Sequence, residues 1–275
     1  MKKKSPEVSV VMSEFNTPKE YLFESINSVL VQTYKNFEFI IIDDSHDQKL
    51  KELIEQKYDD SRIKIIENGY NKGFVYSLNS GIKQAMGKYI MRMDTDDLIP
   101  SDRFEKLVNF IEVNPQYSVV SSMAVEFSGK MKFGINGTPG EKSRKDVMRG
   151  DTPIHAASIM LKNDLEDIGL YRNDFLRAED LALWCELLLA NKKLFVIDDT
   201  LYEYRVNPGD YKKRTFKNRK GEISARLYFY PKLGAGPIEY LRIIKSILAG
   251  LAPMFLIRIY RSKIALARVK GQDNG

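Results

Sequence analysis

The sequence has one cysteine and no long apolar run, and both absences limit what the chain can be. Cys185 stands alone among 275 residues, which excludes an intramolecular disulfide framework and fits a reducing compartment. The longest uncharged stretch near the C-terminus, residues 246–257, contains Pro253 and is shorter than the ~20 residues of a membrane-spanning helix. The N-terminal MKKKSPEVSVV has no apolar segment before a cleavage site, so we expect no signal peptide.

Several common ligand-binding motifs are also missing. No GxGxxG follows the first apolar segment and no GxxxxGK[ST] occurs anywhere, which argues against dinucleotide-binding and P-loop proteins. The acidic residues in YIMRMDTDDLIP do not fit an EF-hand loop, because Leu98 and Ile99 occupy positions that need an oxygen ligand and a glycine. The ligand of this acidic cluster must therefore be sought elsewhere.

Charge is distributed unevenly along the chain. The net charge is +6, but residues 205–275 carry 16 Lys and Arg against 4 Asp and Glu. The residues before them carry 27 basic and 33 acidic side chains. The chain thus consists of a mildly acidic body and a basic tail, an asymmetry that concerns binding partners rather than the fold.

Apolar strands alternate with helical patterns through the body. Short apolar runs predict buried strands, and helical patterns separate them. Thr17 and Glu20 are expected to form a capping box at the first helix, and Gly87 to provide the C-cap of the third. The order predicts an α/β fold with a mostly parallel sheet flanked by helices. The predicted strands are 8–12, 37–42, 62–66, 89–93 and 117–123, and the helices are near 17–30, 48–57, 74–86 and 102–113.

Polar residues follow three of these strands: residues 13–16, Asp43 with Asp44, and residues 94–97. The carboxyl ends of parallel strands share one edge of a sheet, and ligands bind there where the strand order reverses. The three carboxylates of residues 94–97 suit a hard divalent cation that a substrate's phosphates complete. The alternative is a helix N-terminus at which Asp96 and Asp97 stabilise the helix dipole.

Four segments in this order resemble the family 2 glycosyltransferases of bacterial polysaccharide synthesis, which have the GT-A nucleotide-sugar-binding fold. They are VSVVMSEFN, SINSVLVQTYKNFEFIIIDDS, NKGFVYSLNSGIKQAMGKYIMRMDTDD and AEDLALW. The resemblance covers about residues 7–205. It implies a Rossmann-like GT-A catalytic domain over residues 1–205, with nucleotide-sugar binding in 7–100, the acceptor side in 101–205, and a basic amphipathic helical tail in 206–275.

The resemblance implies a metal-binding DxD motif made by Asp94 and Asp96, with Asp96 favoured as the direct ligand of Mn²⁺ or Mg²⁺. Asp94 would also contact the donor. Asp97 is an additional acidic residue that could orient the acceptor or cap the following helix.

The family's uracil pocket corresponds to Ser13 and Phe15, with Asp44 as the carboxylate that accepts the imide N–H of the base. Phe15 replaces the more usual tyrosine, which keeps a stacking face but loses a hydroxyl. Asn71 and Lys72 stand where the family approaches the base or the diphosphate. A turn that opens a helix, with Asn71 as its cap, is an equal alternative.

On the acceptor side, the resemblance places the catalytic base in the acidic pair Glu179 and Asp180, at Asp180. Its alternative role is the N-cap of the following helix. Trp184 lies one turn beyond Asp180 and could line the acceptor site or fill the core. His155, within an expected strand at 154–161, could contact acceptor or diphosphate, or be a hydrogen-bonded structural residue.

Together these features imply an inverting, metal-dependent enzyme that moves a hexosyl or N-acetylhexosaminyl group from a nucleotide sugar, a UDP-sugar by preference. The acceptor would be a hydroxyl of a glycan or lipid-linked glycan in cell-surface polysaccharide synthesis. A nucleotidyltransferase is an alternative, although it ordinarily has a glycine- and basic-rich loop where this chain has SEFNT. A non-enzymatic membrane or nucleic-acid adaptor on a degenerate fold is another alternative. In such an adaptor the acidic positions are expected to be lost, whereas they are intact in this chain.

The tail mixes apolar residues with Lys and Arg and begins with the basic run YKKRTFKNRK at residues 211–220. Amphipathic helices on an anionic membrane fit this pattern. Helices packed on the catalytic domain are the alternative, and nucleic-acid binding is not expected because the body is acidic and lacks a recognition motif. We therefore expect a cytoplasmic protein held peripherally on the inner face of the cell membrane.

Overall fold

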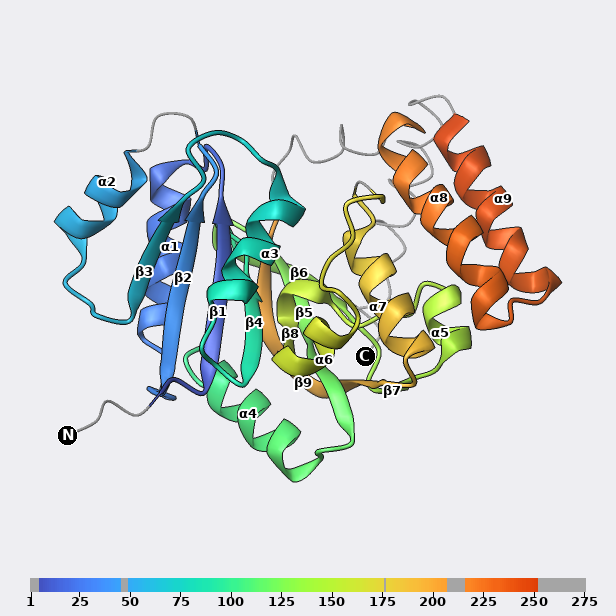
Figure 1. The fold of residues 1–275 in the computed structure, drawn as a ribbon, viewed down its shortest axis with the longest axis horizontal. Coiled ribbons are helices and arrows are strands. Elements are labelled where there is room, and N and C mark those ends of the chain that lie inside the picture. The colour runs from blue at the N-terminus through green and yellow to red at the C-terminus, as the bar shows by residue number, and fades with distance from the viewer. Residues whose placement is uncertain (1–4, 46–48, 176, 207–215, 252–275) are drawn as a thin grey trace.

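The computed structural model describes residues 5–45, 49–175, 177–206 and 216–251 (Figure 1). Within these residues nine strands form one sheet in the order β3-β2-β1-β4-β8-β5-β9-β7, and β6 pairs with β5. The strands are β1 (Val8–Glu14), β2 (Phe37–Asp43), β3 (Ile63–Glu67), β4 (Tyr89–Met93), β5 (Tyr117–Ser128), β6 (Met131–Asn136), β7 (Gly140–Lys142), β8 (Ser158–Leu161) and β9 (Lys193–Arg205).

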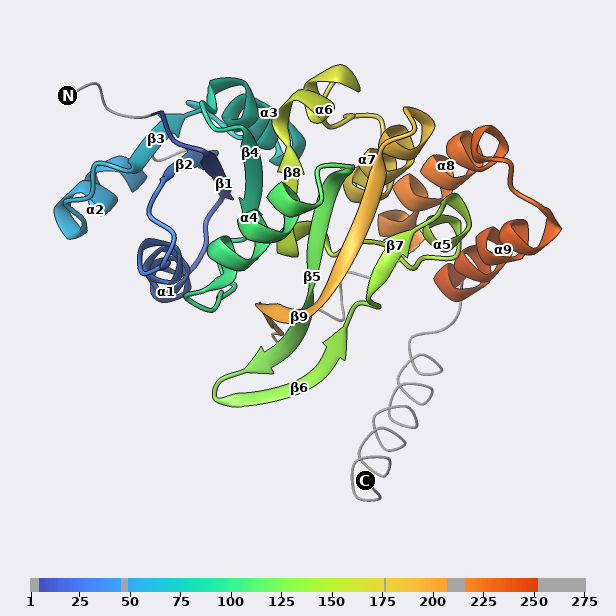
Figure 2. The same ribbon diagram turned by 90° about the horizontal axis from the view of Figure 1, so that it is seen from below.

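Helices cover both faces of the sheet. Figure 2 shows α1 and α4 on one face and α3, α6 and α7 on the other. The helices are α1 (Lys19–Leu30), α2 (Leu50–Lys57), α3 (Phe74–Gln84), α4 (Arg103–Val113), α5 (Arg144–Met148), α6 (Lys162–Asp167), α7 (Glu179–Leu189), α8 (Phe216–Leu233) and α9 (Pro237–Leu251), with a 3₁₀ turn η1 (His155–Ala157).

The first four strands are parallel, as the sequence predicts. β1 pairs in parallel with β2 on one side and with β4 on the other, so the strand order reverses between β1 and β4. Beyond β4 the sheet is mixed, because β8 runs antiparallel to both β4 and β5, while β5 and β9 are parallel. The expectation of a mostly parallel sheet is thus correct for strands β1 to β4, and the rest of the sheet is mixed.

The alternation of side chains along a strand divides the core into two layers. Val8, Val10 and Met12 of β1 pack with α1 and α4, whereas Val11 packs with α3 and α7 on the opposite face. Every apolar residue of β1 is buried on one face or the other, which is why the segment reads as a continuous apolar run rather than an alternating one.

Two predicted helix caps are absent, and both residues have another role. Pro18 is the N-cap of α1, and the hydroxyl of Thr17 donates to Thr95 Oγ1 at 2.7 Å instead of capping the helix. Ala85 ends α3, so Gly87 is not its cap. A Cβ at Gly87 would lie 2.6 Å from the backbone nitrogen of Ser9, so glycine is needed there because β1 passes close by.

The described helices of the tail pack on the body. Ala225, Phe229 and Tyr230 of α8 are buried in the same core as α7, and the Tyr230 hydroxyl donates to the carbonyl of Met148 at 2.5 Å. This is the packing alternative that the sequence left open for the tail. Residues 252–275 and the first half of the basic run, residues 211–215, lie outside the described residues. Where the chain is described, no helix has the length and apolar character needed to cross a membrane.

Candidate active site

A pocket of about 330 Å³ lies where the strand order of the sheet reverses, outside the carboxyl ends of β1, β2 and β4. Its walls bring together most of the predicted donor-side residues. A larger hollow of about 420 Å³ beside α2 shares only Thr17 with it and contains none of the predicted site residues. The pocket is lined by Ser13, Phe15, Thr17, Asp44, Asn71, Gly73, Phe74, Asp94, Thr95 and Asp96.

Asp44 organises the turn that leads into α3. Its Oδ1 accepts the backbone N–H of Lys72 at 2.8 Å, and its Oδ2 accepts that of Gly73 at 2.9 Å. The side chain of Asn68 donates to the same Oδ1. Gly73 is the N-cap of α3 with φ near +91°, so Asn71 is not the cap that the sequence allowed. Asp44, directly after β2, holds the turn before α3 through these N–H groups, and it still lines the pocket.

Phe15 is an exposed residue among the predicted base contacts. Its ring is 46% exposed at the pocket wall, where a planar base could stack on it. Ser13 and Asn71 also line the pocket. The Lys72 ammonium lies over the rings of Tyr70 and Tyr76, at 5.0 and 4.8 Å from their centroids, and is not part of the lining.

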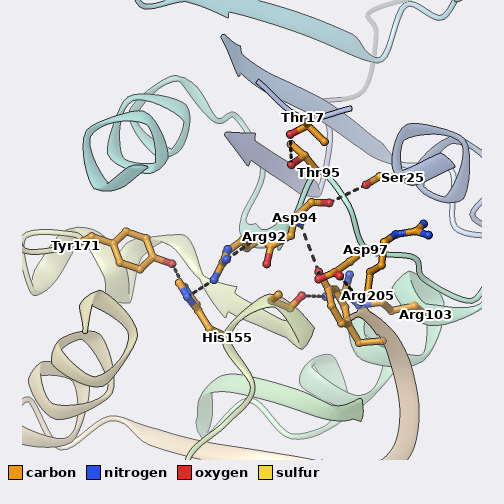
Figure 3. Close-up of polar contacts among 12 residues, drawn as sticks. Thr17, Ser25, Arg92, Asp94, Thr95, Asp97, Arg103, His155, Tyr171 and Arg205 are labelled. Atoms are coloured by element: carbon orange, nitrogen blue, oxygen red, sulfur yellow. Dashed lines mark hydrogen bonds and ion pairs between the residues drawn. The ribbon is translucent and has the colours of Figure 1, made fainter. Parts of the chain in front are cut away.

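Asp94 forms an ion pair with an arginine that the sequence motif did not reveal. Arg92, two residues earlier in β4, places its Nη2 2.5 Å from Asp94 Oδ1 (Figure 3). The charged residue inside the apolar strand YIMRM is the sequence signal that could have identified this partner. Ser25 of α1 fixes the backbone of the same turn by donating to the Asp94 carbonyl at 2.7 Å.

Asp94 and Asp96 are the residues that fit a divalent cation. Both line the pocket, and among the described residues no three His, Cys, Asp or Glu side chains are grouped to hold a metal ion. The chain therefore offers a cation one or two carboxylates at an open pocket. Mg²⁺ and Mn²⁺ commonly bind in this way, with substrate phosphates completing the shell.

Asp97 faces away from the pocket and holds β9. Its Oδ1 accepts the backbone N–H of Arg205 at 2.7 Å and its Oδ2 accepts the Tyr202 hydroxyl at 2.8 Å (Figure 3). Burial raises the pKa of the Asp97 carboxyl well above its usual range, and the charges of Asp94 and Asp96 raise it further. Asp97 is only 1% exposed and does not cap α4, whose N-cap is Asp102. Its contacts give it a structural role in place of the two that the sequence suggested.

His155 is buried between the two halves of the site. It begins the turn η1 rather than a strand, and its Nδ1 lies 2.6 Å from Arg92 Nη1 while its Nε2 lies 2.5 Å from the Tyr171 hydroxyl (Figure 3). The Trp184 ring packs edge-on against it, with centroids 5.6 Å apart. Trp184 is fully buried, so of its two predicted roles the structure favours the core.

The acidic pair at the start of α7 is half-buried. Ala178 is the N-cap of α7, and Asp180 lies in its first turn with Oδ1 accepting the N–H of Leu181 at 2.7 Å. Burial raises the pKa of Asp180, while that N–H and Arg92 lower it. Burial also raises the pKa of Glu179, and the charge of Asp180 adds to this effect. The two carboxyls are thus more basic than exposed ones.

Arg205 and Tyr171 are site residues for which the sequence carries no recognisable signal. Arg205, at the end of β9, donates from Nε to the Asp96 carbonyl at 2.6 Å and from Nη2 to Glu24 at 2.5 Å. It thereby ties the acidic turn to α1. Both residues approach the site from segments more than 70 positions away from residues 94–97, so only the folded chain reveals them.

Comparison with known proteins agrees with this geometry. The model of the glycosyl transferase family 2 matches residues 9–165. The putative glycosyltransferase EpsE of Bacillus subtilis is 30% identical and the alignment covers 98% of this chain and 97% of EpsE. The UDP-Glc:alpha-D-GlcNAc-diphosphoundecaprenol beta-1,3-glucosyltransferase WfaP of Escherichia coli is 28% identical, covering 76% of this chain and 81% of WfaP.

Solved structures share the fold. Mannosyltransferase PcManGT from Pyrobaculum calidifontis, in complex with GDP-Man and Mn²⁺, superimposes with a TM-score of 0.68 at 16% identity, over 96% of this chain and 81% of PcManGT. The chain belongs to glycosyl transferase family 2, and it is a glycosyltransferase with a GT-A-like fold. Family membership removes support from the nucleotidyltransferase and adaptor alternatives.

Proposed function

We propose that this glycosyltransferase transfers a hexosyl group, with inversion, from a UDP-sugar to a hydroxyl of a lipid-linked glycan during cell-surface polysaccharide synthesis. The observation that carries the proposal is the pocket itself, in which Phe15, Asp44, Asp94 and Asp96 meet at the switch point of the sheet. The name of WfaP, a relative that uses UDP-Glc and a diphosphoundecaprenol-linked acceptor, supports the choice of donor and acceptor.

The donor half positions the nucleotide. Phe15 would stack on the base, and Asp44 would accept its imide N–H beside the turn that Asp44 already holds. Asp94 and Asp96 would hold Mn²⁺ or Mg²⁺, as the Mn²⁺ complex of PcManGT suggests for this fold. When bound, such a cation stabilises the negative charge that develops on a departing diphosphate.

The acceptor half supplies the base. Asp180 would accept the proton of the acceptor hydroxyl as its oxygen attacks the anomeric carbon and the nucleoside diphosphate departs from the opposite face. Burial raises the pKa of Asp180, which makes it a stronger proton acceptor. A single displacement inverts the anomeric centre and needs no covalent intermediate with the enzyme. Glu179 lies beside Asp180 and is the second candidate for this role.

A thermal-shift panel followed by a transfer assay tests the proposal. The purified chain is heated with UDP-Glc, UDP-GlcNAc or GDP-Man, each with and without Mn²⁺, and the stabilising donor is then supplied with a lipid-diphosphate-linked sugar. We expect a UDP-sugar to raise the melting temperature only with the cation, and a β-linked product to form. Stabilisation by none of the three donors, or full turnover in excess chelator, would contradict the proposal.

We also propose that the C-terminal region attaches the enzyme to an anionic membrane surface, on the cytoplasmic face where a lipid-linked acceptor would be presented. Ile238, Leu241 and Ile244 of α9 are spaced by three residues and are all more than half exposed, whereas Ile243 faces the core. This outward apolar stripe stands in the segment with 16 basic residues. Apolar and basic groups together are typical of interfacial helices.

Substitution tests attachment better than truncation. Removing the chain from residue 211 onward would also remove Phe229 and Tyr230 from the core, so loss of binding could reflect unfolding. Leu241→Glu should weaken binding to anionic vesicles, and raising the salt concentration should weaken it further. Leu227→Glu, at an equally exposed site on α8, is the matched control. Equal vesicle binding by both variants and the wild type would leave α9 as a packing helix.

A further inference from the structure

A continuous line of polar groups, partly buried at Asp94 and Arg92 and buried at His155 and Tyr171, leads from the pocket into the protein. It runs from Asp94 to Arg92, then to His155 and to Tyr171, with separations of 2.5, 2.6 and 2.5 Å between the polar atoms (Figure 3). The residues come from the β4 turn, β4, η1 and the loop before α7. Of these four residues only Asp94 lines the pocket, so the contacts among the other three require another explanation.

Hydrogen-bond chemistry determines the direction of this line. A guanidinium has only donors, so Arg92 must donate and His155 Nδ1 must accept. A neutral imidazole with an unprotonated Nδ1 carries its proton on Nε2, which therefore donates to the Tyr171 oxygen. Burial lowers the pKa of His155 well below its usual value, and Arg92 lowers it further. His155 is thus held as the neutral Nε2–H tautomer.

Tyr171 is fixed from both ends. The side chain of Asn79 in α3 donates to the Tyr171 carbonyl at 2.8 Å and accepts the Tyr171 N–H at 3.0 Å. The hydroxyl is held by His155 and is buried. Tyr171 is therefore held at its backbone by α3 and at its hydroxyl by His155. His155 cannot turn without breaking its bond to Tyr171, so the Arg92 guanidinium bound to it has little freedom.

The charge of Arg92 acts on both sides of the site. It pairs directly with Asp94, and it lowers the pKa of Glu179 and of Asp180, opposing the effect of burial. The guanidinium also lies over the Phe74 ring of the donor pocket, 4.8 Å from its centroid. One cation thus offsets carboxylates that belong to different steps of the reaction.

We propose that Arg92, His155 and Tyr171 are positioning residues of the transfer reaction, which hold the Arg92 guanidinium against the donor-side carboxylate Asp94. The proposal rests on the function proposed above. His155 and Tyr171 would prevent the guanidinium from turning away from Asp94, and its positive charge would help to keep the base Asp180 ionised.

The charged groups around the base determine the sign of the expected effect. The negative charges of Asp180 and Asp94 raise the pKa of Glu179, and that of Glu222 in α8 raises the pKa of Asp180. Arg92 is the positive group that opposes them. Removing it should raise the pKa of the base, so that activity at saturating donor and cation is lost at a higher pH than in the wild type.

Kinetics of Arg92 variants test this consequence. In Arg92→Met the acid limb of kcat should move to higher pH, since the positive charge of Arg92 lowers the pKa of Asp180. Arg92→Lys keeps the charge and should keep the limb, with a lower kcat. Arg172→Met is the control, because Arg172 pairs with Glu186 on the same helix but not with Asp180. Its limb should not move.

Two substitutions of His155 separate its bonds. Asn carries a polar group at the position of Nδ1 and can still accept from Arg92, whereas Gln reaches the position of Nε2 and can still donate to Tyr171. If holding Arg92 is what matters, His155→Gln should lower kcat more than His155→Asn, with UDP affinity unchanged in both. Equal kcat values for the two variants would overturn the proposal, even if Arg92→Met does not fold.

An NMR measurement separates failure of this proposal from failure of the proposed function. The chain has two histidines, so ¹⁵N-labelled imidazole signals are readily assigned with the His155 variants. His155 should remain a neutral Nε2–H tautomer from pH 5 to 8 whether or not a donor is present, and a protonated or Nδ1–H ring would overturn the proposal. An unmoved acid limb in Arg92→Met would also overturn it while leaving the glycosyltransferase function intact. Absence of transfer from any UDP-sugar by the wild type would overturn the proposed function, and the role of Arg92 with it.

Discussion

The proposed donor half and the proposed acceptor half of the site are built in different ways. On the donor side, Asp44 accepts hydrogen bonds from Asn68, Lys72 and Gly73 of the neighbouring loop. It lines a pocket of about 330 Å³. On the acceptor side, His155 and Tyr171 reach back to Arg92 in a buried position, 63 and 79 residues away in the chain. Repeating βαβ units make the first half, whereas long-range side-chain contacts make the second.

Two adjacent carboxylates show the difference most sharply. Asp96 lines the pocket, while Asp97 is buried against Tyr202 and Arg205 at the end of β9. A motif of three aspartates therefore places one carboxylate at the pocket and buries another against β9. The neighbouring positions belong to different faces of the turn, so substitutions at them should have different consequences.

The largest expected effect is at the acceptor side. Asp180→Asn should lower kcat by about 1,000-fold, within the range that general bases contribute, because the acceptor hydroxyl loses its proton acceptor. UDP affinity measured by calorimetry should be unchanged, since Asp180 does not line the donor pocket. Glu179→Gln is the matched variant and should retain much more activity. Equal loss of UDP binding in Asp180→Asn would place Asp180 in the donor site.

A smaller loss is expected at the donor side. Asp96→Asn should lower kcat/KM by about 100-fold, because cation-assisted stabilisation of the leaving diphosphate contributes several kcal/mol. Binding of UDP in the presence of Mn²⁺ should weaken, while the unfolding midpoint stays close to that of the wild type. Unchanged Mn²⁺-dependent binding would show that Asp96 is not a cation ligand.

Asp97 should affect stability rather than binding. Asp97→Ala leaves the Tyr202 hydroxyl and the Arg205 N–H without an acceptor, and each unsatisfied buried group costs about 1–3 kcal/mol. We expect the free energy of unfolding in urea to fall by roughly 3 kcal/mol. Asp96→Ala is the neighbouring control and should change it much less. Similar unfolding curves for the two variants would remove the contrast between the two positions.

The smallest effect concerns the pH dependence of stability. His155 has a pKa well below that of an unfolded histidine, so below about pH 6.5 the unfolded chain binds a proton that the native site disfavours. Stability should therefore fall as the pH falls, by about 1.4 kcal/mol for each pH unit from this group. Urea unfolding between pH 5 and 8 should show a shallower slope for His155→Asn. Parallel slopes would mean that His155 is freely protonated in the fold.

The alternating pattern predicted the donor half well. Strands β1 to β4, the intervening helices and the shared edge of Ser13, Asp44 and Asp94 all follow from apolar periodicity and from the rule that parallel strands end together. Capping was predicted less well. The residues chosen for it, Thr17 and Gly87, serve contacts with Thr95 and Ser9 that lie 78 positions away in sequence.

By itself, the sequence determined the order of the elements from β1 to β5, the family and the acidic edge, because these depend on local periodicity and on motifs contiguous in the chain. Only the tertiary structure decided that Asp97 holds β9, that Arg92 pairs with Asp94, and that the first helices of the tail share the core of the body. The physical reason is that the role of a charged side chain depends on which distant group neutralises it once water is removed. Burial and partner are properties of the folded chain, and no local pattern specifies them.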